Sequence, residues 1–199
     1  MTDPEITVVI PTIPPRKELL RRAVDSVWAQ TLRPYDVLVP KDIHHRGAAA
    51  TRQLGLEHVK SDWVAFLDDD DELMLNHLKV LAAAARIFNA DYVFSYFMVK
   101  DGTGRERPEI DPLGHFGRAF DPDQPTQTTI TTLVRTELAQ AVGFREPPPG
   151  ALINGETYGE DFQFTVECVK AGAKIVHVPR RTWWWHHHAG NTSGRPDRW

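Results

Sequence analysis

Residues 64–71 read Val64-Ala65-Phe66-Leu67-Asp68-Asp69-Asp70-Asp71, and this stretch decides the fold that the sequence predicts. A short apolar run bounded by polar residues is typical of a buried strand in a parallel sheet. Ligands of open α/β sheets lie outside the carboxyl ends of such strands. Carboxylates gathered there repel one another unless a cation neutralises them, and Mg²⁺ or Mn²⁺ prefers oxygen ligands. The stretch therefore predicts an edge of the sheet that binds a metal ion and phosphate.

The same acids have a simpler interpretation as the solvated start of a helix. Asp is favoured near helix N-termini, and a helical pattern rich in Leu and Ala runs from Leu73 to Phe88. The acid run alone leaves this alternative open, and further groups of residues favour the metal site.

Composition limits the classes of protein to which the chain can belong. It has 199 residues, a formal net charge of −4 and a sequence pI near 6.1. One domain, or one with a small appended lobe, is expected, and no basic excess favours nucleic acid. Cys168 is the only cysteine, which excludes an intrachain disulfide. We expect a cytoplasmic protein, because the sequence lacks an apolar run of about twenty residues and Met1–Glu5 does not resemble a signal peptide.

Strands and helices alternate in the first half of the prediction. β-Branched apolar runs predict strands over 6–10, 35–39, 63–67 and 91–99. Apolar residues at helical spacing predict helices over 17–30, 47–59 and 73–88. This order predicts an α/β fold with a mostly parallel central sheet and helices on both faces.

The second half is less regular. Residues 105–127 are rich in Pro, Gly and charge and predict long loops. Strands are expected over 128–134 and 174–178, helices over 136–142 and 162–171, and an irregular segment over 182–199. We expect a single domain over 1–199, in which 1–100 is a nucleotide-binding half and 101–199 shapes the site of a second substrate.

Gly159-Glu160-Asp161 stands at the start of a predicted helix. Acids at this position are often explained by the helix dipole alone. The functional interpretation is a general base, since a suitably placed carboxylate can take a proton from an attacking hydroxyl. Asp161 would be that base, and Glu160 would orient neighbouring groups.

The segment Trp183-Trp184-Trp185-His186-His187-His188 is rich in aromatic residues and imidazoles. In an extended segment His186 and His188 would share one side while His187 faces away. One imidazole joining a carboxylate and phosphate oxygens suits Mn²⁺ better than Mg²⁺. Packing is the usual role of the tryptophans, although an exposed indole face can stack on a sugar ring.

Pro11-Thr12-Ile13-Pro14-Pro15-Arg16 follows the first strand and contains no glycine. The absence of Gly-rich phosphate loops disfavours dinucleotide-binding dehydrogenases, P-loop NTPases and nucleotidyltransferases. Arg16 is placed to reach a phosphate. Asp42 is placed to bond a base or ribose, and Arg52 is placed to neutralise phosphate or hold the acid run.

Taken in order, these features resemble glycosyltransferase family 2 of the GT-A enzymes. The resemblance covers residues 6–193, and the segments that carry it are Val9–Thr12, Ser26–Thr31, Gly47–Leu56, Phe66–Asp71, Val142–Phe144, Gly159–Phe162 and His188–Ser193. It implies a GT-A fold with a half that binds a nucleotide sugar and an acceptor-binding half. The acceptor-binding half would carry the base and the C-terminal His/Trp segment.

The resemblance also implies roles for individual residues. The acid run looks like a DxD motif with Asp68 and Asp70 at its ends, and Asp70 would bind the metal together with His188. Asp161 looks like the catalytic base. The expected donor-binding residues are Pro11, Thr12, Arg16, Asp42, Arg52, Asp68 and Asp69. The residues expected near the acceptor are Glu160, Trp184 and Trp185.

The implied reaction moves a sugar from a nucleoside diphosphate sugar, with a UDP-sugar favoured, to an acceptor hydroxyl, with Mn²⁺ or Mg²⁺ as cofactor. A base opposite the leaving group implies one displacement that inverts the anomeric carbon. The chain departs from many members where Lys41–Arg46 leads directly into the next helix, which abbreviates the nucleoside pocket. Gln53 also replaces a frequent Asn.

Two other classes of protein stay open. A non-catalytic module that binds a sugar or nucleotide would keep the tryptophans but would not need Asp161 beside a metal site. A glycosyltransferase acting on a modified nucleic acid is disfavoured by the negative net charge.

Overall fold

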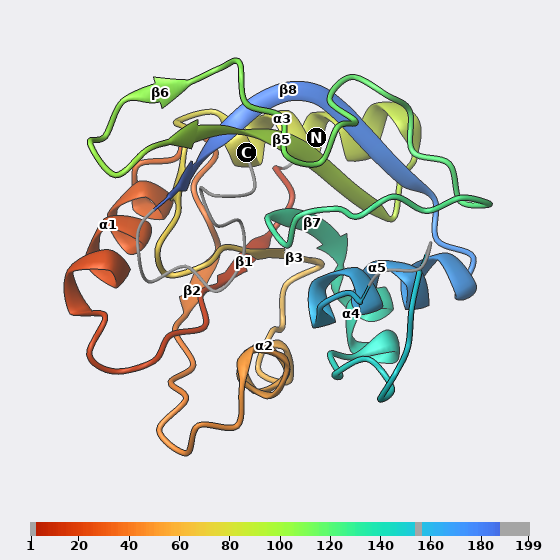
Figure 1. The fold of residues 1–199 in the computed structure, drawn as a ribbon, viewed down its shortest axis with the longest axis horizontal. Helices are drawn as coiled ribbons and strands as arrows, with labels where there is room; N and C mark the ends of the chain where they lie inside the picture. The colour runs from red at the N-terminus through yellow and green to blue at the C-terminus, as the bar shows by residue number, and fades with distance from the viewer. Residues whose placement is uncertain (1–2, 154–156, 188–199) are drawn as a thin grey trace.

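A mixed β-sheet organises the chain (Figure 1). A computed structural model describes residues 3–153 and 157–187, and in it the strands lie in the order β2-β1-β3-β7-β5-β8-β4. A short strand, β6 (Glu106–Arg107), pairs with β5 outside this path. Helices pack against the sheet, so the α/β class predicted from the sequence is confirmed.

The first three strands form a parallel part of the sheet. β1 (Ile6–Val9) pairs with β2 (Asp36–Leu38) on one side and with β3 (Trp63–Phe66) on the other. Every residue of β1 and β3 is buried, as expected for apolar runs covered on both faces. Helices α1 (Lys17–Trp28) and α2 (Ala48–Leu56) connect these strands. The five predicted elements are confirmed, although each is slightly shorter than predicted.

The rest of the sheet is not parallel throughout. β5 (Tyr92–Lys100) does not lie beside β3, because β7 (Thr132–Arg135) lies between them and is antiparallel to both. Residues 101–131 contain no helix that could carry the chain back across a face of the sheet, so the returning strand runs antiparallel. The prediction of a mostly parallel sheet is therefore only partly met.

The C-terminal strand is longer than predicted. β8 (Ile175–His186) runs parallel to β5 beyond Pro179, so the expectation of an irregular segment from Thr182 is wrong over the residues described. The register with β5 shifts between Ser95 and Phe97. Pro179 lies in this irregularity, where its missing N–H removes no regular ladder bond.

A short strand separates the acid run from the third helix. β4 (Glu72–Leu73) pairs antiparallel with β8, and α3 (His77–Phe88) begins four residues later than predicted. The main chain between them is engaged by β8, since the N–H of Met74 donates to the carbonyl of Thr182 at 2.9 Å. The acids therefore lie between two strands and do not begin a helix, so the simpler interpretation of them is wrong.

Helices cover both faces of the sheet, as predicted (Figure 1). One core cluster joins the sheet to α1 and α3, and the other joins it to α2, α4 (Thr136–Val142) and α5 (Glu160–Lys170). Successive residues of β1 point to opposite faces, so Val8 belongs to the first cluster and Val9 to the second. Within the described ranges, no helix combines the length and apolar character needed to cross a bilayer.

Candidate active site

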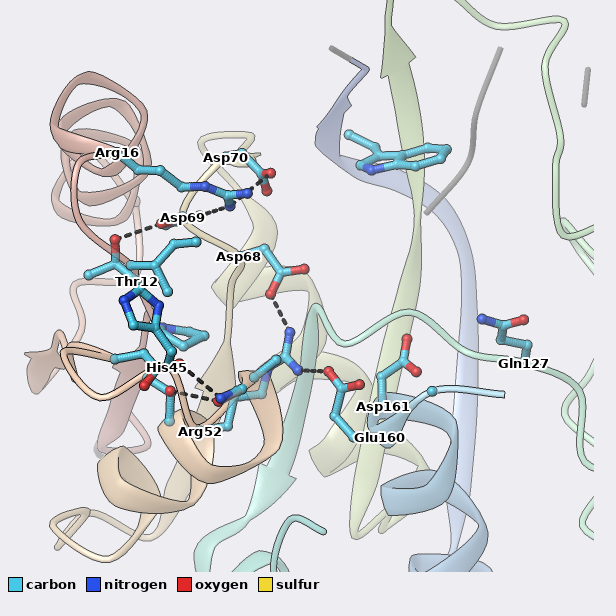
Figure 2. A pocket seen from close by; sticks show the side chains of 18 residues that line it. Thr12, Arg16, His45, Arg52, Asp68, Asp69, Asp70, Gln127, Glu160 and Asp161 are labelled. Carbon is cyan, nitrogen blue, oxygen red and sulfur yellow. Dashed lines mark hydrogen bonds and ion pairs between the residues drawn. The ribbon is translucent and has the colours of Figure 1, made fainter. Parts of the chain in front are cut away.

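A cavity of about 630 Å³ lies beyond the carboxyl ends of β1 and β3, beside the N-terminal ends of α2 and α5 (Figure 2). This is the edge at which the sequence predicted a ligand site. The predicted site residues that line the cavity are Pro11, Thr12, Arg16, Asp42, Arg52, Asp68, Asp69, Asp70, Glu160, Asp161 and Trp185. The tertiary structure thus brings most of the candidates to one place.

Asp69 differs from its neighbours in the acid run. One carboxylate oxygen accepts the hydroxyl of Thr12 at 2.6 Å, and the other accepts an N–H of Arg16 at 2.8 Å. The residue is 3 % exposed. Asp69 therefore fastens the acid run to the loop after β1, and both of its oxygens are engaged within the protein.

Asp68, Asp70 and Asp71 form a convergent cluster, called here the acid triad. Each offers a carboxylate oxygen, and these oxygens all lie within 4.8 Å of one another. Burial raises the pKa of Asp71 well above its usual range, and the charges of Asp70 and Asp68 raise it further. Carboxylate oxygens are what hard divalent cations bind, and a cation would relieve this repulsion. The residues present therefore fit a divalent metal ion.

Arg52 links the acid triad to helix α5. It is 5 % exposed. One nitrogen of its guanidinium donates to Asp68 at 2.6 Å and another donates to Glu160, as Figure 2 shows. Arg52 therefore contacts the acid run at Asp68 and the start of α5 at Glu160, and its expected role at a phosphate stays a prediction.

Asp161 lies in the first turn of α5, beside Glu160 (Figure 2). Burial and the charge of Glu160 raise its pKa and Arg52 partly offsets them, so that the pKa is about 6. A carboxylate whose pKa lies near neutral pH is a better proton acceptor than an ordinary Asp. Gly159 makes room for it, since a Cβ there would lie 2.9 Å from an oxygen of Asp161.

Asp42 accepts hydrogen bonds from the main chain just before helix α2. Its two oxygens accept the N–H groups of Arg46 at 2.7 Å and Gly47 at 2.8 Å. The hydrogen bond from Arg46, together with that from Gly47, lowers the pKa of Asp42. The carboxylate lines the cavity, but both of its oxygens are already engaged by the turn before α2.

The side chains of the two candidate tryptophans point in opposite directions, because neighbours on a strand face opposite sides of the sheet. Trp185 lines the cavity. Trp184 instead donates its indole N–H to Glu106 at 2.8 Å, and the ammonium of Lys100 lies 3.9 Å from its ring centroid. Only Trp185 is therefore placed to contact a ligand in this cavity.

The first of the C-terminal histidines lies beside the acid triad. The main-chain N–H of His186 donates to Asp71 at 3.0 Å, and its imidazole bonds Glu72. Burial and the charge of Arg22 lower the pKa of His186 and Glu72 partly offsets them, so that the pKa is about 4. The predicted metal ligand His188 lies outside the described residues.

Three residues near the site were not singled out from the sequence. Asp71 was one acid in a run, and only the fold shows that it converges with its neighbours while Asp69 does not. His45, with a φ of 53°, lines the cavity, and so does Gln127 at the end of a long loop. The next residue, Thr128, is anchored by a 2.6 Å hydroxyl contact with Thr165. A polar residue in a loop carries no periodicity that could have marked it.

This α/β fold, with a cavity at the strand ends that is bordered by acids, is the arrangement found in GT-A glycosyltransferases. A family model described as Glycosyl transferase family 2 matches residues 41–142, about half of the chain. The chain belongs to this family, and the resemblance drawn from its sequence is confirmed.

The relatives support the same assignment. The Succinoglycan biosynthesis protein ExoW of Rhizobium meliloti (strain 1021) is 33% identical over 114 residues, which cover 44% of this chain and 36% of that protein. Residues 1–349 of S. aureus TarS have the same fold. The complex with UDP-GlcNAc gives a TM-score of 0.73 at 17% identity and covers 94% of this chain. The complex with UDP gives a TM-score of 0.70 at 18% identity and covers 92% of this chain. Each match covers 60% of the solved chain. The chain spans less than two thirds of these relatives' lengths.

Proposed function

We propose that this chain transfers a sugar from a nucleoside diphosphate sugar, with a UDP-sugar favoured, to an acceptor hydroxyl, with inversion at the anomeric carbon. The observation that carries the proposal is the pairing, in one cavity, of the acid triad with a buried carboxylate, Asp161, whose pKa is raised to about 6. Arg52 bridges the two groups. A binding module would have no need of this pairing.

The acid triad would hold Mn²⁺ or Mg²⁺, with Asp70 as the principal ligand and Asp68 and Asp71 beside it. When bound, the ion would neutralise charge that develops on the leaving diphosphate. His188 stays a predicted further ligand.

The chain's own residues perform the proton transfer. Asp161 accepts the proton of the acceptor hydroxyl while the hydroxyl oxygen bonds to the anomeric carbon. The bond from that carbon to the diphosphate oxygen breaks, and the electron pair leaves with the diphosphate on the side of Arg16 and the acid triad. Because Asp161 acts on the opposite face of the sugar, the configuration inverts. Glu160, held by Arg52, orients this end of α5.

The two halves of the chain would divide the substrates. Lining residues from Pro11 to Asp70 would form the donor site, and those from Gln127 to Trp185 would face the acceptor. Trp185 offers an aromatic surface of the kind that stacks on sugar rings. The relative named for succinoglycan biosynthesis supports a saccharide acceptor.

Calorimetric titration of UDP, GDP and UDP-GlcNAc, with and without Mn²⁺, tests the proposal. We expect one nucleotide to bind the wild type in a Mn²⁺-dependent way, and Asp70→Ala to lose that dependence. If no nucleotide bound under any metal condition, the donor site would be refuted. Metal-independent binding of UDP-GlcNAc, with no binding of UDP or GDP, would favour the non-catalytic module.

A further inference from the structure

Arg16 holds two carboxylates with one nitrogen atom. Its Nη1 lies 2.8 Å from an oxygen of Asp69 and 3.4 Å from an oxygen of Asp70 (Figure 2). The side chain is one quarter exposed and lines the cavity. The shorter contact is an ordinary charged hydrogen bond, whereas the longer one is at the outer limit of hydrogen bonding.

The partner at 2.8 Å is held from two sides. Asp69 is buried, and its second oxygen is fixed by the hydroxyl of Thr12. It lies outside the acid triad. The function of this carboxylate is therefore to tether the guanidinium of Arg16 at the rim of the cavity.

The partner at 3.4 Å is shared. Asp70 faces Arg16, but it also belongs to the acid triad, which fits a divalent cation. A guanidinium and a divalent ion on one carboxylate repel each other, and the longer contact is the one that such repulsion would break first. Arg16 would stay tethered by Asp69, with its remaining N–H groups available at the cavity. A guanidinium matches the geometry of phosphate oxygens.

Resting on the donor and metal sites proposed above, we propose that Arg16 is an exchangeable counter-ion. Without metal it neutralises Asp70, and when the metal-bound donor is present it leaves Asp70 for the diphosphate while Asp69 keeps it in place. Arg16 thereby makes metal binding and diphosphate binding mutually favourable, and this coupling is reciprocal by thermodynamic linkage. An arginine that only bound phosphate would leave the affinity for metal alone unchanged.

The test measures Mn²⁺ affinity by electron paramagnetic resonance and UDP affinity by calorimetry, each with and without the other ligand. In Arg16→Gln, Mn²⁺ alone should bind several-fold more tightly, because its competitor is gone. UDP in the presence of Mn²⁺ should bind about tenfold more weakly, so the coupling factor falls. Arg16→Lys keeps the charge and should leave the affinity for Mn²⁺ alone near the wild-type value while still weakening UDP.

Arg22→Gln is the matched control. Arg22 donates to the main-chain carbonyl of Asp70 at 2.7 Å, so it supplies a nearby charge without holding that carboxylate in any contact described. Its loss should leave the coupling factor at the wild-type value.

The outcomes separate the two proposals. If Arg16→Gln kept the wild-type coupling factor, or bound Mn²⁺ alone no more tightly, the counter-ion role would be refuted while Mn²⁺-dependent UDP binding by the wild type still supported the donor site. If the wild type bound neither Mn²⁺ nor UDP, both proposals would fall. Circular dichroism and thermal melting of each variant would identify a variant that fails to fold, and Arg16→Lys would then decide.

Discussion

Asp161 shows how its surroundings give an ordinary side chain a special property. The carboxylate is buried and lies next to Glu160, which together hold its pKa near 6, while Arg52 limits the rise. The sequence indicated an acid at the start of a helix. It could not indicate the pKa, because the desolvation and two of the interacting charges come from the fold.

Asp161→Asn should reduce turnover by about 10²–10⁴-fold, because the amide cannot take the proton. Donor binding should change little, since Asp161 is not in the acid triad. Steady-state kinetics and calorimetry of the same preparation measure both effects. Glu167→Gln, a change of the same kind further along α5, should keep wild-type turnover.

The wild-type rate should also depend on pH in a defined direction. The proposed base, Asp161, would work only when ionised, and its raised pKa is about 6. The rate should therefore be level above that pH and fall as pH drops through it. A pH–rate profile checks this dependence. If Asp161→Asn kept wild-type turnover, Asp161 would not be the base.

At the scale of elements, helix α2 lies unusually close to strand β1. A Cβ built on Gly55 would lie 2.6 Å from Cγ1 of Val9 and 3.0 Å from Cγ of Pro40. Val9 is fully buried in the core. The glycine is tolerated inside the helix because only hydrogen fits there, and this close contact sets the position of Arg52 on the same helix.

Gly55→Ala should therefore destabilise the fold. Overpacking a core costs about 1–3 kcal/mol, which outweighs the roughly 1 kcal/mol that Ala gains over Gly in a helix. Urea unfolding measures the loss. In the double variant Val9→Ala/Gly55→Ala the contact is relieved, so its loss should be smaller than the sum of the two single losses. Strict additivity would mean that the close approach is not what the substitution disturbs.

Prediction succeeded for the elements whose signal is local. The strands and helices around Val8, Val27 and Leu56 follow from periodic burial, and these elements were found with small errors at their ends. It failed for β8, where Pro179 reads as a strand terminator but falls in a shift of register with β5. It also failed at β4, where pairing with a strand more than a hundred residues away prevents an early helix start.

At the scale of the molecule, one sheet joins both halves of the chain. β5 from the first half pairs with β8 from the second along nine residue pairs, and both halves line the cavity. We therefore propose one domain and expect a single calorimetric unfolding transition. Two resolved transitions would contradict this arrangement.

Donor binding should raise the melting temperature of that transition. A ligand at 100 times its Kd adds about 2.7 kcal/mol, which corresponds to roughly 5–10 °C for a chain of this length. Differential scanning calorimetry with UDP and Mn²⁺ measures the shift. Asp70→Ala should lose its metal-dependent part, and a full shift in that variant would exclude Asp70 as the principal metal ligand.

The sequence by itself determined the α/β class, the family, and the two acidic segments that border the cavity, because these depend on periodicity and on short motifs. Only the tertiary structure decided which acids of the run converge, that Asp69 tethers Arg16, that Trp184 faces away from the cavity, and that Asp42 is committed to a turn. The physical reason is that these roles depend on contacts between residues distant in the chain and on the burial that the whole fold creates.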